Sequence, residues 1–475
     1  MKRVLICLLF FLGRLICGAQ DKWDLKECVD YALANNISVK QADLQTRFSQ
    51  LELELDELSR WPTANFQASS GYSFGLSENP TTGTLESRNF FNTQFGLSAN
   101  VTLFNWFTKK YLITSSELTH EADKANVKKV QDDVALNVAV GYLQALLAKQ
   151  QVNIAGIQVQ QTLIQLDITQ KKVSAGLLPE LNASQLEAQL ASDSSLLVTA
   201  EGNVEQLLLQ LKALLNLDAA TPFDIETPPV ELIPVESLSD LRPEVVYNLA
   251  LVNLPQQRVN DLRVKSAQQL VSAARSSMYP SISAFGGLNS RYVNIESVQE
   301  SLFVPEKSTG AFVRMGTTRY EVLAPGFDVV STGITPFSNQ LRNNFGQNIG
   351  IGLSIPIFNG GALRGNWKRA ILNVQNLQLQ QQSANQTLKQ DIYRAYTDAI
   401  IALQKFNASR KAVEAADKAY VFAQKRYDVN LLTTFELINN QNLLLRARQD
   451  MLTAQFDYVF KMKLLEFYKG QGLKL

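Results

Sequence analysis

Few residues of this chain belong to the types that catalyse reactions or bind metals. Its single histidine, His120, excludes a site with two histidines, and three cysteines are too few for a four-cysteine zinc site. The chain has no GxxxxGK[ST] phosphate loop, no HExxH zinc motif and no GxSxG nucleophile motif. Gly360, Gly361 and Gly365 follow a predicted strand without a nucleotide fingerprint, which indicates a turn. The sequence therefore predicts no enzyme activity, no cofactor and no metal site.

The overall composition excludes further classes of protein. The 475 residues are 46% hydrophobic and 19% charged, and 45 Lys plus Arg against 44 Asp plus Glu give a formal net charge of +1. Such a chain is too apolar for bulk disorder and too nearly neutral for a nucleic-acid-binding surface. Because an average soluble protein has about 25% charged residues, something other than a charged surface must cover part of this molecule.

The N-terminus has the layout of a secretory signal peptide at residues 1–19. Two basic residues precede an apolar run that ends at Leu12, and the small residues Gly18 and Ala19 suit a cleavage site. Removal of this segment would change the net charge from +1 to −2 and leave Cys28 as the remaining cysteine, which we expect in a buried helix. No later stretch reaches the roughly 18 apolar residues of a transmembrane helix.

The rest of the chain is a tandem repeat. The segments FGLSANVTLFN, from position 95, and IGIGLSIPIFN, from position 349, align without gaps 254 positions apart. The same offset pairs Gly176 with Asn430, whereas upstream Trp61 matches Tyr279 at an offset of 218. The difference indicates an insertion in the second copy. The predicted divisions are repeat 1 at 20–217, a Pro-rich connector at 218–243, repeat 2 at 244–475 and an insertion at 293–344.

Each repeat predicts a helix of about 39 residues, a pair of strands and then a long helical hairpin. The strands are expected at about 63–75, 90–104, 281–292 and 346–358. The hairpins are expected at about 106–217, with a tip near 176, and at about 360–469, with a tip near 430.

The strands alternate between two chemically different faces. One face of the strand from Phe91 to Leu103 is largely apolar, and the other carries only Asn, Gln, Ser, Thr and Gly. This pattern, at about 12 residues a strand, is typical of a transmembrane β-barrel with an apolar exterior and a polar lumen. A soluble sheet with one face on a core shows the same alternation. The signal peptide favours the barrel.

The helices predict a long coiled coil. About 65 residues after Lys109 contain no proline, which corresponds to roughly 100 Å of helix and exceeds any compact domain. Apolar residues recur every seven positions in both return helices, at Ala183, Leu190, Leu197, Val204 and Leu211 and at Leu437, Leu444, Met451 and Tyr458. Four strands cannot close a barrel, so several copies must share one. Three copies would supply 12 strands and 12 long helices, although other symmetries are physically possible.

At this level of detail the chain resembles the TolC-like outer membrane efflux proteins. The resemblance rests on the duplicated order of elements, on WP and YP at the strand entries, on LFN and IFN at the strand exits, and on two tip segments, VSAGLLPELNASQLEAQ and YDVNLLTTFELINNQNLL. It implies an α+β membrane protein, a homotrimer whose 12-stranded β-barrel lies in outer-membrane lipid and continues as a 12-helix α-barrel in the periplasm. It also implies a passive exit duct that binds a periplasmic adaptor (a membrane fusion protein) and, indirectly, an inner-membrane pump of the RND or ABC type, with no nucleic acid.

Three alternatives remain open. The duct could serve a type I protein secretion system instead of the efflux of small compounds. In a different class, the chain could be a periplasmic coiled-coil adaptor or a filament-forming structural protein, but neither requires four amphipathic strands.

The resemblance also assigns roles to the hairpin tips. Adaptor contact is carried by a small-Gly-Leu motif that matches Ala175, Gly176 and Leu177 in the first copy and Val429, Asn430 and Leu431 in the second. Asparagine often replaces glycine where a turn needs positive φ, so the turn is expected in both copies.

Family resemblance further implies a constriction at the periplasmic mouth. Glu436 matches an acidic ring position, the next such position is Asn439, and Tyr427 matches a tyrosine that helps to hold the closed state. An ordinary solvated helix carboxylate is the alternative for Glu436. We also expect the 293–344 insertion to be an extracellular lid over the outer mouth.

Overall fold

We describe the chain from a computed structural model that covers residues 22–78, 85–87, 89–229, 233 and 235–470. The expected signal peptide lies outside these residues. The chain forms two compact units, each described here by itself. The helical unit contains residues 22–53, 115–268 and 372–470, and the sheet unit contains residues 54–114 and 269–371. None of the described helices is both long enough and apolar enough to cross a membrane.

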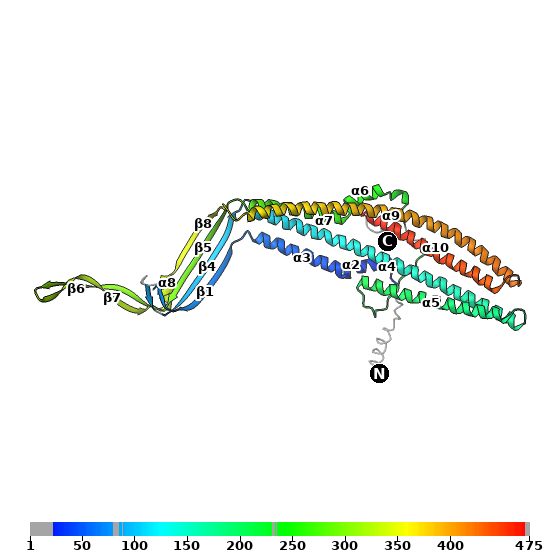
Figure 1. The fold of residues 1–475 in the computed structure, drawn as a ribbon, viewed down its shortest axis with the longest axis horizontal. Helices are drawn as coiled ribbons and strands as arrows, with labels where there is room; N and C mark the ends of the chain where they lie inside the picture. The colour runs from blue at the N-terminus through cyan, green and yellow to red at the C-terminus, as the bar shows by residue number, and fades with distance from the viewer. Residues whose placement is uncertain (1–21, 79–84, 88, 230–232, 234, 471–475) are drawn as a thin grey trace, which may run out of the picture. The chain divides into compact units, whose positions relative to one another are not determined.

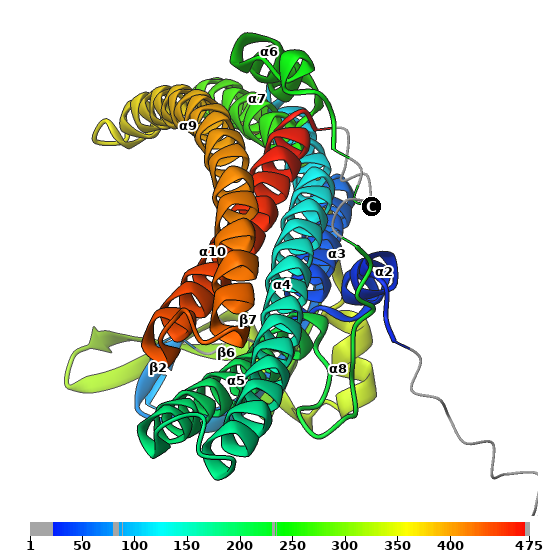
Figure 2. The same cartoon turned by 90° about the vertical axis from the view of Figure 1, so that its right-hand side faces the viewer.

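Two long hairpins make up most of the helical unit (Figures 1 and 2). The first joins α4 (Thr108–Ser174) to α5 (Glu180–Leu215), and the second joins α9 (Ala362–Asp428) to α10 (Thr434–Tyr468). Helices α4 and α9 each have 67 residues, which corresponds to about 100 Å. Their interior seams are built from the heptad residues, among which Leu211 is completely buried.

The helix expected before the first strand is in fact two helices, so the prediction of one continuous helix was wrong. Helix α2 (Leu25–Asn35) ends where Asn36 adopts an extended conformation with ψ 133°, and α3 (Ile37–Leu58) follows. The Asn36 side-chain amide donates a hydrogen bond to the Leu214 carbonyl of α5 at 2.9 Å. The Asn36 side-chain oxygen also accepts a hydrogen bond from the Ser38 N–H at 2.9 Å, so Asn36 caps the start of α3.

The second repeat breaks at the equivalent position. After a 3₁₀ turn, η2 (Leu238–Asp240), α6 (Pro243–Asn253) ends at Leu254 and α7 (Pro255–Ser276) begins. Leu254 lies 218 positions after Asn36, the offset found upstream in the sequence. Here the proline that follows disfavours a helical conformation at Leu254.

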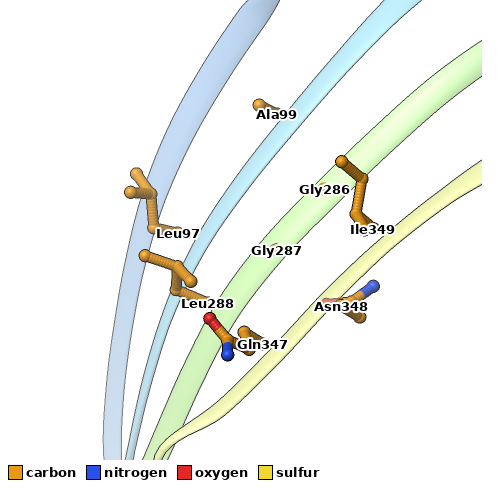
Figure 3. A pocket seen from close by; sticks show the side chains of 8 residues that line it. All are labelled: Leu97, Ala99, Gly286, Gly287, Leu288, Gln347, Asn348 and Ile349. Atoms are coloured by element: carbon orange, nitrogen blue, oxygen red, sulfur yellow. The ribbon is translucent and has the colours of Figure 1, made fainter.

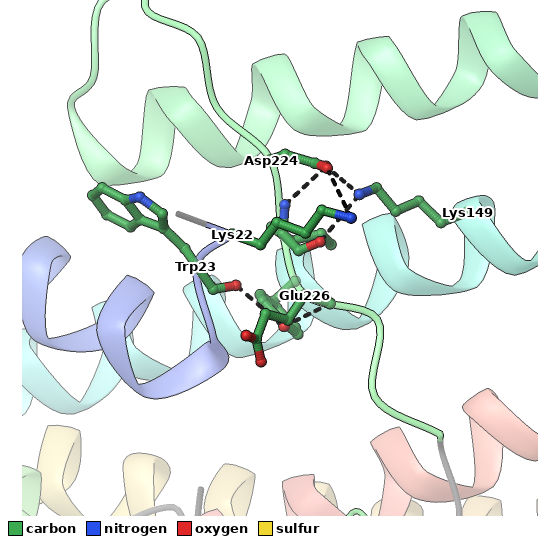
Figure 4. Close-up of polar contacts among 7 residues, drawn as sticks. Lys22, Trp23, Lys149, Asp224 and Glu226 are labelled. Carbon is green, nitrogen blue, oxygen red and sulfur yellow. Dashed lines mark hydrogen bonds and ion pairs between the residues drawn. The ribbon is translucent and has the colours of Figure 1, made fainter. Parts of the chain in front are cut away.

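The first described residues and the connector pack together on α4 (Figure 4). Trp23 and Ile225 form a parallel backbone bridge, and the Trp23 N–H donates to the Asp224 carbonyl at 3.0 Å. Lys149 of α4 forms an ion pair with the Asp224 carboxylate. Ile225 and Cys28 belong to one apolar core and are both fully buried, which confirms the buried helix position predicted for Cys28.

The sheet unit contains a four-stranded antiparallel sheet in the order β1-β4-β5-β8 (Figure 1). Its strands are β1 (Thr63–Ser73), β4 (Phe90–Phe104), β5 (Ser281–Val293) and β8 (Gly346–Ser354). The two repeats meet at the centre, where β4 pairs with β5, and β1 and β8 form the two edges.

The register of the sheet confirms the two faces predicted from the alternation. Phe66 of β1 lies opposite Leu97, which in turn lies opposite Leu288, so these apolar side chains share one face. Gly96 lies opposite Gln67 and Asn289 on the other face. One-residue alternation therefore separates an apolar surface from a polar one across both repeats.

The two strand-to-helix junctions have the same unusual backbone. Trp106 and Phe107 have φ values of 51° and 66°, and Gly360 and Gly361, 254 positions later, have 64° and 81°. Positive φ strains a non-glycine residue, and aromatic packing offsets this in the first repeat, where the Trp106 ring lies 5.1 Å from that of Tyr279. Gly360 and Gly361 therefore form a turn, as their sequence context predicted, whereas Gly365 lies in the first turn of α9.

Two further hairpins extend the sheet unit. A short one joins β2 (Leu76–Glu78) to β3 (Leu85–Ser87), and a long one within the insertion joins β6 (Glu296–Met315) to β7 (Thr318–Ile334).

The helix of the insertion, α8 (Phe337–Asn343), lies on the apolar face of the four-stranded sheet. Its Phe337 ring contacts the rings of Phe95 and Tyr292 at 6.3 and 5.1 Å, and Ser290 donates to the Leu341 carbonyl at 2.7 Å. This part of the insertion packs on the sheet, and a lid formed by the insertion over the outer mouth stays a prediction.

Candidate gate and docking tips

Both hairpin tips are built by the same helix-ending motif. In the first tip the Gly176 N–H donates to the Val173 carbonyl and the Leu177 N–H donates to the Lys172 carbonyl, each at 2.9 Å. This pair of bonds is a Schellman motif, which requires the left-handed conformation that Gly176 adopts with φ 75°. Leu177 remains exposed beyond the turn.

The second tip repeats this geometry with asparagine. The Asn430 N–H donates to the Tyr427 carbonyl at 3.0 Å and the Leu431 N–H donates to the Arg426 carbonyl at 2.8 Å, while Asn430 has φ 59°. The turn expected with asparagine in place of glycine is therefore present. Val429 and Leu431 are exposed, so each tip presents apolar side chains to its surroundings. Adaptor contact at these residues stays a prediction.

Tyr427 connects the two hairpins just before the second tip. Its side chain is 2% exposed, and its hydroxyl lies 3.0 Å from the Thr169 hydroxyl of α4 and 3.2 Å from that of Thr434 in α10. On the same side, Lys172 Nζ lies 5.4 Å from the Tyr427 ring centre and donates to the Asp428 carbonyl at 3.3 Å. The residue thus occupies a buried position where α4, α9 and α10 meet.

A second polar cluster lies between the hairpins and is centred on a buried carboxylate. Asp193 of α5 is 3% exposed and accepts hydrogen bonds from Thr162 at 2.6 Å and from Gln189 at 2.7 Å. The second hairpin joins through Gln441, which donates to the Thr162 hydroxyl at 3.0 Å, and through Asn442, whose amide bonds to that of Gln189. All of these donors are neutral, so hydrogen bonds alone compensate for the burial of the carboxylate.

The sequence pattern did not single out this cluster, although it contains a signal. Asp193 lies three positions after the heptad residue Leu190, where the same seam elsewhere has Leu186, Leu207 and Leu214. An acidic residue at an interior seam position indicates a specific polar contact. Thr162 and Gln441 could not have been found in this way, because uncharged polar residues are common on helices.

Glu436 lies three residues into α10 and completes a capping box. Thr433 accepts from the Glu436 N–H, and the Glu436 carboxylate accepts from the Thr433 N–H at 3.0 Å and from its hydroxyl at 2.8 Å. These hydrogen bonds from Thr433 hold the pKa of Glu436 below its ordinary value. Glu436 and Asn439 are both exposed in the single chain. Their role in a constriction stays a prediction.

The four-stranded sheet has a pocket on its apolar face. Figure 3 shows a pocket of about 610 Å³ that Leu97, Leu288 and Ile349 border on the apolar face, where Gly286 leaves the floor without a side chain. It contains no acid, base or nucleophile. Among the residues that the structure describes, no group of His, Cys, Asp and Glu side chains could hold a metal ion.

Comparison with known proteins agrees with this architecture. The sequence profile of the family described as "Outer membrane efflux protein" matches residues 28–217 and 246–460. The chain is 21% identical to the outer membrane protein TolC of Escherichia coli K12 over 69% of its own length, and this match spans 59% of TolC. It is also 21% identical to the cation efflux system protein CusC of the same organism, over 94% of this chain and 86% of CusC.

Solved structures share the fold at low sequence identity. A crystal structure of CusC matches with a TM-score of 0.74 at 18% identity and covers 94% of this chain and 92% of that one. The outer membrane protein VceC of Vibrio cholerae matches with a TM-score of 0.69 at 16% identity, over 94% of this chain and 96% of that one. The profile match extends over both repeats, and this chain therefore belongs to the outer membrane efflux protein family.

Proposed function

We propose that three copies of this outer-membrane protein form the exit duct of a tripartite efflux system. Their sheets would close into one 12-stranded β-barrel, and their helices would form a 12-helix α-barrel below it. Substrates would pass through the duct passively, in agreement with a sequence that contains no GxxxxGK[ST] phosphate loop.

The observation that carries this proposal is the chemistry of the four-stranded sheet. One face is largely apolar and the other is lined mainly by Asn, Gln, Ser, Thr and Gly, together with Phe285 and Arg291, while β1 and β8 are the two edges of the sheet among the described strands. Unpaired edges are not tolerated in lipid, so β1 of one copy would pair with β8 of the next until the barrel closes. Beyond the part that α8 covers, the apolar face would then contact lipid, and the polar face would line a water-filled lumen.

Helix α3 supports the same assembly. Its apolar residues follow a heptad pattern, and they are exposed in the single chain at Ile37, Leu44, Phe48, Leu51, Leu55 and Leu58. α3 leads into the edge strand β1, and α9 follows the other edge strand β8. A neighbouring copy that pairs its β8 with β1 would bring its α9 towards this seam.

We assign the binding of partner proteins to the two hairpin tips of each chain. The exposed apolar residues of the two Schellman turns, Leu177, Val429 and Leu431, are suited to a helical hairpin of a periplasmic adaptor, which would in turn connect the duct to an inner-membrane pump. We assign the closed state to the Tyr427 contact and the constriction to Glu436, three copies of which would attract multivalent cations.

The experiment uses the purified full-length protein in planar bilayers. The variant Glu436→Gln removes the charge but can preserve the capping box, because glutamine also serves at this position. We expect weaker block by multivalent cations and little change in helix content. Glu180→Gln is the matched control, since Glu180 is also an exposed acid in the first turn of its helix. Wild-type block in Glu436→Gln would refute the constriction, and a protein that forms no oligomer or pore would refute the duct itself.

A further inference from the structure

The long hairpin of the insertion leaves an aromatic surface uncovered. Within the described part of the chain, strands β6 and β7 pair only with each other and form a sheet of two strands. A hairpin of two strands is marginally stable by itself in water and normally needs a further partner. At about 3.3 Å per residue, the 20 residues of β6 extend for roughly 65 Å.

The uncovered residues lie on one face of this hairpin. Phe303 lies opposite Phe327, and their rings are 5.7 Å apart. Leu323 follows on the same face of β7, and Phe312 lies opposite Glu321, which also shares this face. Phe303 and Phe327 are 58% and 56% exposed, and Phe312 and Leu323 are similarly uncovered. We call Phe303, Phe312, Leu323 and Phe327 the aromatic face.

Charges at the far end of this face argue against lipid as its cover. Arg314 and Arg319 lie directly opposite each other, and Arg319 lies 3.5 Å above the Phe312 ring. Charged side chains are costly in hydrocarbon, so a face that combines them with Glu321 is unsuited to burial in the membrane. Among the described residues neither guanidinium forms an ion pair, although like charges opposite each other on a sheet repel. An acid from outside the hairpin would relieve this repulsion.

The order of elements in the chain indicates a partner that could supply both an apolar cover and an acid, namely another copy of the same hairpin. Two residues separate the end of β5 from the start of β6, and the chain returns through α8 to β8, the edge strand that would join the next copy. We propose that the β6–β7 hairpins of the three copies pack their aromatic faces against one another above the barrel. This proposal rests on the trimer proposed above. Arg314 and Arg319 of one hairpin then lie near Glu321 of its neighbour.

The area available for such a contact is close to that of a specific interface. An aromatic side chain contributes about 150–250 Å², and nine half-exposed phenylalanine rings from three copies would together bury on the order of 900 Å², to which three leucines add. Specific interfaces start at about 1,200 Å² in total. The hairpin contact therefore approaches this range as an extension of the barrel interface.

Single-cysteine crosslinking of the purified trimer tests this packing. Leu323→Cys places a thiol on the aromatic face, and Val322→Cys, the matched control, places one on the opposite face of the same strand. Cys28 can remain, since it is fully buried. With a short bismaleimide we expect a crosslinked dimer of chains from Leu323→Cys at about ten times the yield of the control, because packed faces raise the effective thiol concentration.

Three other results would refute the proposed hairpin contact, and they differ in what they imply for the duct. A size-exclusion profile that still shows a trimer, with no dimer or equal dimer in both variants, refutes the hairpin contact and leaves the duct proposal intact. Crosslinking of Leu323→Cys to a different protein on whole cells, without a dimer, assigns the face to a foreign partner. Absence of any trimer refutes both proposals.

Discussion

The polar cluster at Asp193 makes a quantitative prediction about how firmly the two hairpins are held together. Replacement by alanine removes the acceptor for Thr162 and Gln189, whose bonds of 2.6 and 2.7 Å are short. Because each buried hydrogen bond to a charged group contributes about 1.5–3 kcal/mol, Asp193→Ala should lower the local free energy of opening by about 3–5 kcal/mol. Asp193→Asn keeps one acceptor oxygen and should lower it by less.

Hydrogen exchange of the intact protein in detergent, read by mass spectrometry, measures this effect. A loss of about 3 kcal/mol increases opening by roughly a hundredfold, so peptides of α5 and α10 around the cluster should exchange about a hundred times faster in Asp193→Ala. Ser192→Ala is the control, because Ser192 is the exposed neighbour of Asp193 on the same helix.

A double-mutant cycle separates this network from a general loss of packing. Thr162→Val removes the hydroxyl that bonds both Asp193 and Gln441, so its effect and that of Asp193→Ala should be clearly less than additive. Additive effects, or unchanged exchange in Asp193→Ala, would show that the cluster does not hold the hairpins together.

Three further predictions concern single positions. Gly176→Ala should destabilise the first tip by about 1–2 kcal/mol because φ is 75°, whereas Asn430→Gly should be tolerated, and hydrogen exchange at each tip measures both. Hydrogen bonds from Thr433 lower the pKa of Glu436 in the folded protein. The stability that these bonds contribute is present above the pKa of Glu436 in the unfolded chain and is lost as the pH falls through the lower pKa of the folded protein. Thr433→Ala should therefore raise the pH at which cation block disappears in bilayers. Burial raises the pKa of Cys28 to about 12, so maleimide at neutral pH should label it only after denaturation, and labelling of the native protein would contradict its burial.

The periodic features of this protein could be predicted from its sequence. The offset of 254, the two faces of each strand and the heptad seams all depend on which residues recur at a constant spacing, and the spacing of side chains along a helix or strand is a local property. The same local chemistry explains why Asn430 could be expected to turn the chain as Gly176 does.

Contacts between distant segments needed the tertiary structure. The Asn36 side chain bonds to the Leu214 carbonyl, a partner 178 positions away that no local pattern indicates. The contacts of Tyr427 with Thr169 and of Gln441 with Thr162 likewise join residues that are far apart in the sequence. Glu436 matched an acidic position in sequence, but only the fold revealed that its carboxylate also completes the Thr433 cap.

The sequence by itself therefore determined the repeat, the long hairpins and the amphipathic sheet, since these follow from periodic burial along each element. Tertiary structure decided which polar side chains the packed hairpins enclose, as at Asp193, and that α8 packs beside the sheet through Phe337. Both contacts depend on how elements far apart in the chain are aligned with one another. That alignment is determined by the packing of whole surfaces, and a single residue does not determine it.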